Sequence, residues 1–263
     1  MRDQIEIVSI AHGGLLIKYQ EVKLLIDGIY ALSDMDMSTD RDFLTPIPED
    51  ILYRIVNGVD EFENLDCLLF THFHGDHFNS QKTIECFAGN RIKNIFLPRD
   101  LDPDVIAVEE KAKELGINVF ALDLPFGEWE EQIVENIQIK YFKAAHSGGK
   151  EFSGVAHYCY LISIGEKRIY IAGDADYSDS YQQTMLAGEH VTIGFFNPLY
   201  FHFKAGRKLI SQINPKRVVM YHIPLENNDK YSFRNLSQRS LERFRENLPP
   251  CEIISEEMQK FTI

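Results

Sequence analysis

The chain has 263 residues, and at about 150 residues per domain this length corresponds to one or two domains. Its 40 acidic and 27 basic residues give a net charge of −13, and 44% of the residues are hydrophobic, which excludes a disordered chain and a coiled coil. Because this charge repels a polyanion, no nucleic acid is expected as a partner.

No hydrophobic run approaches the ~18 residues that a membrane-spanning helix needs. The first residues alternate charged side chains with Ile instead of forming the core of a signal peptide. We therefore expect a cytoplasmic protein without a membrane partner. The cysteines form no CxxC pair and are predicted to be buried thiols; they are Cys67, Cys86, Cys159 and Cys251.

The N-terminal segment predicts two strands, residues 5–10 and 15–26. They are joined by a turn at His12-Gly13-Gly14, where glycine can supply a positive φ. Asp27 ends the second strand. The following stretch, residues 31–48, is irregular and acidic, and a connection of this length is typical of a lid or a binding loop.

Strands and helices alternate through the rest of the chain without a linker or a change in composition. This mixture predicts a single α/β domain over residues 1–263, with helices covering the sheets. Helices are expected at 49–57, 78–88, 104–115, 178–187, 204–213 and 236–246, and strands at 67–70, 95–97, 118–121, 137–142, 155–164, 168–172, 191–196 and 217–221.

The segment Thr-His-Phe-His-Gly-Asp-His has three imidazoles and one carboxylate within six residues. His and Asp are ligands suited to zinc or a similar first-row divalent ion. In an extended chain His72 and His74 project to the same side and can hold one ion. Gly75 then lets the chain turn sharply, which puts Asp76 and His77 at the start of the following helix, where they suit a second ion about 3.5–4 Å from the first.

Three further candidate ligands each come just after a run of β-type residues: His146, Asp174 and His222. Residues at the ends of several strands can converge on one edge of packed sheets, which is the usual place for an active site on a rigid scaffold. Taken alone, each would be an ordinary polar loop residue. The remaining histidines have no motif around them and are predicted to be structural; they include His157, His190 and His202.

The motif His72-x-His74-x-Asp76-His77, followed in order by His146, Gly173-Asp174 and His222, resembles the metallo-β-lactamase superfamily over nearly the whole chain. The resemblance implies an αββα sandwich, in which two mixed β-sheets pack face to face with helices on the outside. It also implies a site for two metal ions. The first ion would be bound by His72, His74 and His146, the second by Asp76, His77 and His222, and Asp174 would bridge both.

The segments around His12 and Asp27 resemble the branch of this superfamily that contains L-ascorbate-6-phosphate lactonase. The chain has Gly13-Gly14 where that branch has Ala-Ser or Ala-Thr, and Ala175 where it has Thr. Asp174, in place of Cys, differs from true β-lactamases. His74 also differs from the flavodiiron relatives, in which a Glu is expected.

Other residues are candidates for handling the substrate. Residues 191–225 contain Lys and Arg but no Asp or Glu. Lys204 and Arg207 in this stretch either bind an anionic group of the substrate or belong to a solvated helix face. His12 either contacts a ligand or the substrate, or is only a turn residue. Asp27 is expected to orient a metal ligand through a hydrogen bond.

We therefore predict a hydrolase with two divalent ions, with zinc as first choice and manganese or iron as alternatives. A hydroxide bridging the ions would attack a carbonyl or phosphorus atom, with Asp76 orienting the hydroxide. The expected substrate is a small anionic ester or lactone, and the alternative is a phosphodiester, as in a phosphodiesterase or nuclease. A non-catalytic metal or metabolite sensor remains open, as does assembly into a homo-oligomer.

Overall fold

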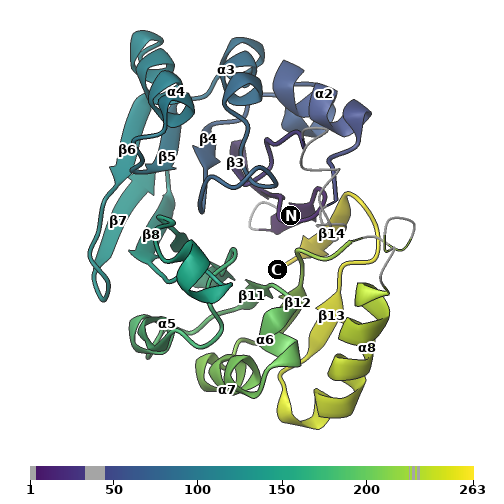
Figure 1. Ribbon diagram of the computed structural model, residues 1–263. Coiled ribbons are helices and arrows are strands. Elements are labelled where there is room, and N and C mark those ends of the chain that lie inside the picture. Colours follow the sequence, from purple (N-terminus) through teal and green to yellow (C-terminus); the bar gives the residue numbers. More distant parts are fainter. Residues whose placement is uncertain (1–3, 33–44, 225, 227–228, 230–231) are drawn as a thin grey trace. The chain divides into compact units, whose positions relative to one another are not determined.

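The computed structural model describes residues 4–32, 45–224, 226, 229 and 232–263. The chain divides into two units, which Figure 1 shows as ribbons. Unit 1 consists of Met1–Asp123 and Glu256–Ile263, and unit 2 of Leu124–Ser255. Each unit has its own sheet and its own helices. A single domain over residues 1–263 stays a prediction.

The described strands of unit 1 form one mixed sheet: β1 (Ile5–Ser9), β2 (Leu15–Tyr19), β3 (Val22–Ile26), β4 (Cys67–Leu69), β5 (Asn94–Pro98), β6 (Asn118–Leu122) and β14 (Gln259–Thr262). Their order is β14-β1-β2-β3-β4-β5-β6. The pairs from β14 to β3 are antiparallel, whereas β3 to β6 are parallel. Parallel neighbours require crossover connections, and here these contain helices.

The helices described in unit 1 lie side by side over one face of this sheet in Figure 1: α2 (Glu49–Asn57), α3 (Ser80–Gly89) and α4 (Pro103–Glu114). The short 3₁₀ helix η1 (Asp60–Phe62) follows α2. Ile55 of α2, Cys86 of α3 and Val108 of α4 are fully buried and belong to one core cluster with Leu68 and Ile95 of the sheet. This packing fixes the loop between β4 and α3, which carries the His- and Asp-rich motif.

Two sequence predictions near the N-terminus need correction. Residues 15–26 form a hairpin instead of one strand, because Tyr19 pairs with Val22 and the chain reverses between them. Gln20 adopts a φ of 53° at this turn, and neither turn residue is Gly, Asn or Pro, so the usual sequence signal is missing. In the turn before β2, the sequence suggested that a glycine would supply a positive φ, but the residue with the positive φ is His12, at 46°.

The described strands of unit 2 form a second mixed sheet: β7 (Trp129–Val134), β8 (Ile137–Lys143), β9 (Tyr158–Ile164), β10 (Lys167–Ile171), β11 (Ile193–Phe196), β12 (Arg217–Met220) and β13 (Cys251–Ile253). Their order is β13-β12-β11-β10-β9-β8-β7. β7 to β10 are antiparallel neighbours, and β10 to β13 are parallel. The carboxyl ends of β10, β11 and β12 therefore share one edge of the sheet.

The described α-helices of unit 2 are α5 (Ser180–Met185), α6 (Leu199–His202), α7 (Lys204–Ile213) and α8 (Phe233–Phe244), and the 3₁₀ helices η2 (Gly149–Phe152) and η4 (Arg245–Asn247) are shorter. Tyr200 of α6 and Ile210 of α7 are fully buried in a cluster with Phe196 and Val218 of the sheet. Gly206 permits the close approach of α7 to α6, because a Cβ there would lie 2.4 Å from the Cα of Tyr200.

Two mixed sheets with helices confirm the α/β fold class expected from the sequence. The acidic stretch expected to be a lid or a binding loop, residues 31–48, falls largely on residues 33–44, which lie outside the described residues. Within the described ranges, no helix is long and apolar enough to cross a membrane. All four cysteines are free thiols, as predicted. Cys67, Cys86 and Cys159 are buried, whereas Cys251 is only half-buried, which corrects the prediction of a buried thiol there.

Candidate metal centre

The candidate ligands of unit 1 lie in the loop between β4 and α3. The backbone N–H of His77 donates to the carbonyl oxygen of His74 over 2.9 Å, which closes a turn around Gly75. The sharp turn is as predicted, but α3 begins only at Ser80. Asp76 and His77 are therefore turn residues, which corrects the prediction that they begin the helix.

Three imidazoles crowd together in this loop. The ring centroid of His72 lies 4.1 Å from that of His77 and 4.6 Å from that of His74. His72 and His77 are both 0% exposed. Nε2 of His77 also lies 3.6 Å from Oδ2 of Asp76. Buried ring nitrogens gathered with a carboxylate form a donor set of the kind that binds a divalent transition metal, so these residues fit such an ion.

Asp27 lies behind this cluster at the end of β3. Its carboxylate accepts hydrogen bonds from the backbone N–H of Thr71 over 2.8 Å and from the Thr71 hydroxyl over 2.6 Å. Nδ1 of His77 lies 3.0 Å from Oδ2 of the same carboxylate. Since an ionised carboxylate can only accept, Nδ1 of His77 donates, which turns its Nε2 away from Asp27. This is the arrangement expected for a residue that orients a metal ligand.

His12 contacts a second candidate ligand. Its Nε2 lies 3.0 Å from Oδ2 of Asp76. The side chain of His12 is 0% exposed and that of Asp76 is 9% exposed. Two neighbouring residues of the loop, Asp76 and His77, are thus each held by a side chain from a turn at the end of a strand.

The candidate ligands of unit 2 gather around one carboxylate. His146 follows β8, Asp174 follows β10 and His222 follows β12. Nε2 of His222 lies 3.1 Å from Oδ1 of Asp174, and Nε2 of His146 lies 3.8 Å from Oδ2. Each oxygen of Asp174 therefore faces a different imidazole.

Backbone pairing between two loops holds His146 next to Asp174. His146 forms an isolated antiparallel bridge with Ala175, and the backbone N–H of Ser147 donates to the carbonyl oxygen of Asp174 over 2.8 Å. The carboxylate of Asp179 accepts from the backbone N–H of Ala145 over 2.9 Å. Burial raises the pKa of Asp179, although the hydrogen bonds from the backbone N–H groups of Ala145 and Tyr181 oppose this shift.

Sequence reasoning missed two residues that support this cluster. Nε2 of His157 accepts a hydrogen bond from the backbone N–H of Asp174 over 2.9 Å, and His157 is 0% exposed. Nδ2 of Asn197 donates to the carbonyl oxygen of Gly173 over 3.1 Å. His157 was expected to be structural, and its contact with the chain at a candidate ligand could not be read from its neighbours in sequence.

Three of the candidate site residues have positive φ angles although none is a glycine. The φ angles are 46° at His12, 47° at Asp27 and 56° at His222. Such a conformation costs a non-glycine residue about 1–2 kcal/mol. Strain of this kind is retained where the surrounding structure imposes it, and it is common at functional sites.

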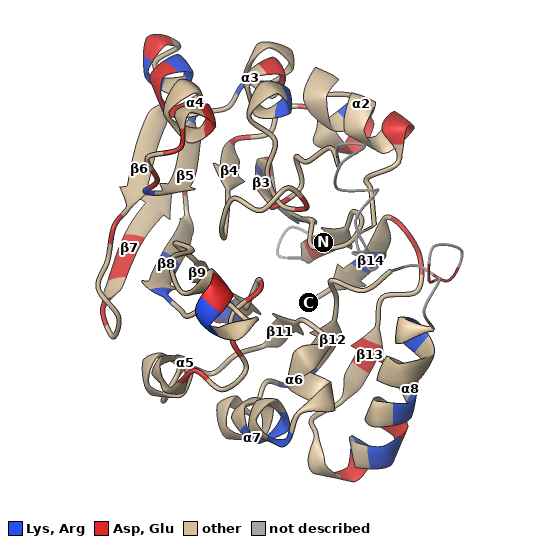
Figure 2. Cartoon of the chain, in the orientation of Figure 1, with Lys and Arg blue, Asp and Glu red and all other residues tan. Residues whose placement is uncertain are grey.

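The stretch without acidic residues, 191–225, contains α7 and its basic side chains. Figure 2 shows Lys and Arg but no acidic residue on α7. Nη1 of Arg207 donates to the carbonyl oxygens of Phe201 and His202 at the end of α6, over 2.7 and 2.8 Å. Its guanidinium also lies 3.6 Å from the ring centroid of Phe244. Arg207 thus packs against the end of α6 and Phe244, and a substrate contact for it stays a prediction. Lys204 is exposed at the start of α7.

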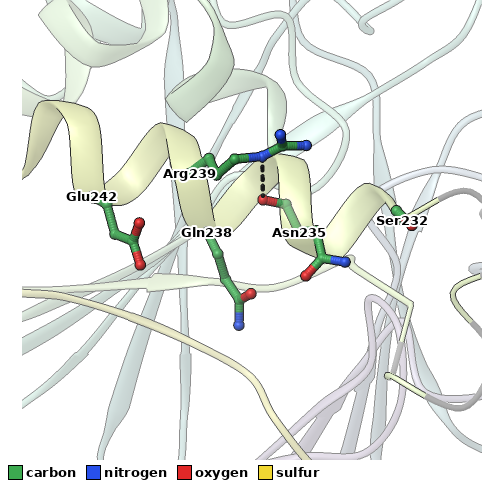
Figure 3. Close-up of a pocket in the computed structure, with 5 residues that line it drawn as sticks. All are labelled: Ser232, Asn235, Gln238, Arg239 and Glu242. Atoms are coloured by element: carbon green, nitrogen blue, oxygen red, sulfur yellow. Dashed lines mark hydrogen bonds between the residues drawn. The ribbon is translucent and has the colours of Figure 1, made fainter.

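One surface pocket, with a volume of about 400 Å³, lies on α8. Figure 3 shows its polar side chains, which come from Ser232, Asn235, Gln238, Arg239 and Glu242. The contact drawn there, from Nε of Arg239 to the carbonyl oxygen of Asn235, lies within the helix. None of these five lining residues is a candidate ligand.

The family model of the beta-lactamase superfamily domain matches residues 42–223. Comparison with curated protein sequences gave no match. Solved structures with a similar fold include a possible metal-dependent hydrolase from Veillonella parvula, at 13% identity and a TM-score of 0.68, with 100% of each chain covered. Yeast PDE1, solved without a ligand, is 14% identical with a TM-score of 0.61, and the match covers 100% of this chain and 99% of PDE1.

CmlA, a diiron beta-hydroxylase from Streptomyces venezuelae, is 13% identical with a TM-score of 0.66. The match covers 100% of this chain and 54% of CmlA, so the chain spans about half the length of that hydroxylase. At these identities the likeness to each solved structure is one of fold.

Proposed function

The chain belongs to the beta-lactamase superfamily, and we propose that it is a hydrolase whose two ligand clusters together hold two divalent metal ions. The observation that carries the proposal is the carboxylate of Asp174, which has an imidazole at each oxygen, 3.1 and 3.8 Å away. A carboxylate in this setting suits a ligand shared by two ions. We assign the first ion to His72, His74 and His146, the second to Asp76, His77 and His222, and both to Asp174.

The chemistry of the donor set favours catalysis over a structural role. Structural zinc sites have four protein ligands and are commonly rich in Cys, whereas catalytic sites leave a position open for water or substrate. The proposed set contains only His and Asp, and one of its carboxylates is shared. Zinc suits these ligands best, and manganese and iron are the alternatives.

When bound, two divalent ions lower the pKa of a water molecule toward neutrality and polarise the oxygen of the bond to be cleaved. We assign to Asp76 the role of accepting a hydrogen bond from the attacking water and thereby orienting it. No cysteine suits the role of nucleophile, because burial raises the pKa of all four thiols, to about 12 for Cys86 and Cys251. We therefore assign the role of attacking group to water.

The proposed substrate is a small anionic ester or lactone. The absence of Asp and Glu from residues 191–225 supports an anion, and the exposed Lys204 is the candidate contact for it. Resemblance of the N-terminal segment to the L-ascorbate-6-phosphate lactonase branch favours a lactone. A phosphodiester is the second candidate, and the likeness in fold to yeast PDE1 is consistent with it.

Turnover that depends on a metal ion tests this function. Purified protein is stripped with a chelator, reloaded with zinc, manganese or iron, and assayed on p-nitrophenyl acetate, bis(p-nitrophenyl) phosphate and a panel of lactones. We expect turnover of at least one compound, its loss on chelation and its return on reloading. Protein that binds metal but turns over none of these compounds would instead be a metal or metabolite sensor.

A further inference from the structure

We propose that His12 is a positioning residue for Asp76: it fixes the orientation of that carboxylate and does not contact the substrate. The inference rests on the proposed function, in which Asp76 binds the second ion and orients water. From the sequence, His12 could contact a metal ligand, contact the substrate or be only a turn residue, and we propose the first of these roles.

The contact between the two side chains is direct and buried. Nε2 of His12 lies 3.0 Å from Oδ2 of Asp76, and the His12 side chain has no exposed surface. Because an ionised carboxylate only accepts hydrogen bonds, Nε2 carries the hydrogen. A substrate arriving from solvent does not reach a side chain without exposed surface, so His12 acts through the residues that it contacts, and its hydrogen bond to Asp76 joins it to a proposed metal ligand.

The backbone of the turn at His12 determines where this side chain points. Its φ of 46° is unfavourable for a non-glycine residue, and two hydrogen bonds maintain the turn. They join the N–H of Ile10 to the oxygen of Gly14, and the N–H of Gly14 to the oxygen of Ala11, both over 2.9 Å. The strained conformation is thus imposed by the end of β1 and the start of β2.

A second turn packs against the first one. A Cβ at Gly14 would lie only 3.2 Å from the Cα of Gly28, which directly follows Asp27. One turn therefore supplies His12 to Asp76, and the turn in contact with it supplies Asp27 to His77. Two neighbouring metal ligands are held by two neighbouring turns, so their relative orientation is set by the sheet of unit 1.

This geometry makes specific predictions for kinetics and for metal binding. Loss of the His12 bond frees the Asp76 carboxylate to rotate, which misplaces one ligand of the second ion and the acceptor for water. The second ion should therefore bind more weakly while the first is retained. Because His12 makes no contact with substrate, kcat should fall with little change in KM. Loss of a residue that orients a metal ligand typically costs about 10–100-fold in metal affinity or activity.

Two amide substitutions form a matched pair for the test. His12→Gln keeps an N–H donor near the position of Nε2, whereas in His12→Asn the donor lies near the position of Nδ1 and cannot reach Asp76. Both are polar and of similar chemistry, and Asn is among the residues that best tolerate a positive φ. His202→Ala serves as a control, because it removes a half-buried histidine that is bonded to Ser237 and lies outside the proposed site.

The measurements are the affinity of each of the two zinc ions by chelator competition, the visible absorption spectrum of the cobalt-loaded protein, and kcat and KM on p-nitrophenyl acetate or bis(p-nitrophenyl) phosphate. In His12→Asn we expect the affinity of one ion to fall about tenfold or more, the cobalt spectrum to change and kcat to fall about 10–100-fold. In His12→Gln we expect the metal affinity, the cobalt spectrum and kcat to lie close to the wild-type values. His202→Ala should match wild type in the same three measurements.

Two results would overturn the inference. One is a rise in KM without a change in the affinity of either ion, which would make His12 a substrate contact. The other is a His12→Asn protein that matches wild type in metal affinity, spectrum and kcat. A wild-type protein that binds fewer than two ions contradicts the proposed function instead, whatever the variants do.

Discussion

The carboxylate of Asp27 lies 3.0 Å from Nδ1 of His77 and holds this imidazole from behind. The same carboxylate accepts two hydrogen bonds from Thr71, and the Thr71 hydroxyl lies 3.0 Å from Nδ1 of His72. One buried carboxylate thus orients His77 directly and His72 through Thr71. In the proposed assignment these two imidazoles bind different ions, so Asp27 supports both.

Substitutions at Thr71 test whether Asp27 orients His72 through the Thr71 hydroxyl. Thr71→Val removes the hydroxyl at nearly constant volume and with it the contact to Nδ1 of His72, so we expect the first ion to bind about tenfold more weakly. Thr71→Ser keeps the hydroxyl and should retain most of the affinity. Metal titration against a chelator measures both variants. Equal zinc affinities in Thr71→Val and Thr71→Ser would show that the hydroxyl does not orient His72.

A substitution of Arg234 should have a large effect on stability. This buried residue donates from Nε to the carbonyl oxygen of Pro224 over 3.1 Å and from Nη2 to that of Ile254 over 2.6 Å. Arg234→Met leaves both carbonyls without this donor, and we expect the free energy of unfolding to fall by about 2–4 kcal/mol. Urea denaturation measures it. The exposed Arg239 on the same helix is the control, and Arg239→Met should change stability by less than about 0.5 kcal/mol.

Two of the basic residues of α7, Arg207 and Lys204, should respond differently to substitution. Arg207→Ala removes two hydrogen bonds to the end of α6 and the contact with Phe244, so we expect a loss of about 1–3 kcal/mol in the free energy of unfolding. Thermal or urea denaturation measures this loss. A stable Arg207→Ala protein with a raised KM for an anionic substrate would instead support Arg207 as a contact of the substrate.

For Lys204→Ala we expect little change in stability, because the side chain is exposed. If Lys204 binds the anionic group, its loss should raise KM for bis(p-nitrophenyl) phosphate more than KM for the neutral p-nitrophenyl acetate. This is the effect of lost ground-state binding. Equal KM changes for the two compounds would leave Lys204 as part of a solvated helix face.

The thiols of the native protein should react slowly. Burial raises the pKa of Cys86 and Cys251 to about 12, and it also raises the pKa of Cys67 and Cys159. A raised pKa lowers the thiolate fraction at pH 8, and the thiolate is the reactive form. Iodoacetamide at pH 8 should therefore label the folded protein slowly and all four thiols of the unfolded protein readily. Rapid labelling of Cys86 in the folded state would contradict its burial.

The sequence predicted the elements that place the candidate ligands, because periodicity and strand ends are local properties. The loop after β4 and the ends of β8, β10 and β12 carry the ligands as expected. Several elements were missed, however. β7 is mostly exposed or half-buried and contains Glu130 and Glu131, and β13 and β14 are short and partly exposed, so none of them has a strong hydrophobic pattern.

The contacts that support the ligands were harder to predict. The role of Asp27 could be guessed from its place at a strand end, whereas the bond between His157 and the backbone of Asp174 joins residues 17 positions apart. The spacing of Arg207 from Lys204 left a substrate contact and a solvated helix face open, and it did not reveal that the Arg207 guanidinium lies against Phe244. Side-chain direction depends on tertiary packing, which helical spacing does not encode.

The number of bound metal ions tests the central claim most directly. Protein reloaded with excess zinc and freed of unbound metal is measured by elemental analysis, together with Asp174→Ala and with Asp123→Ala, which removes an exposed carboxylate. We predict close to two ions per chain in wild type and in Asp123→Ala, and a clear loss of bound zinc in Asp174→Ala. A single ion in fully loaded wild-type protein, or full zinc content in Asp174→Ala, would contradict the account.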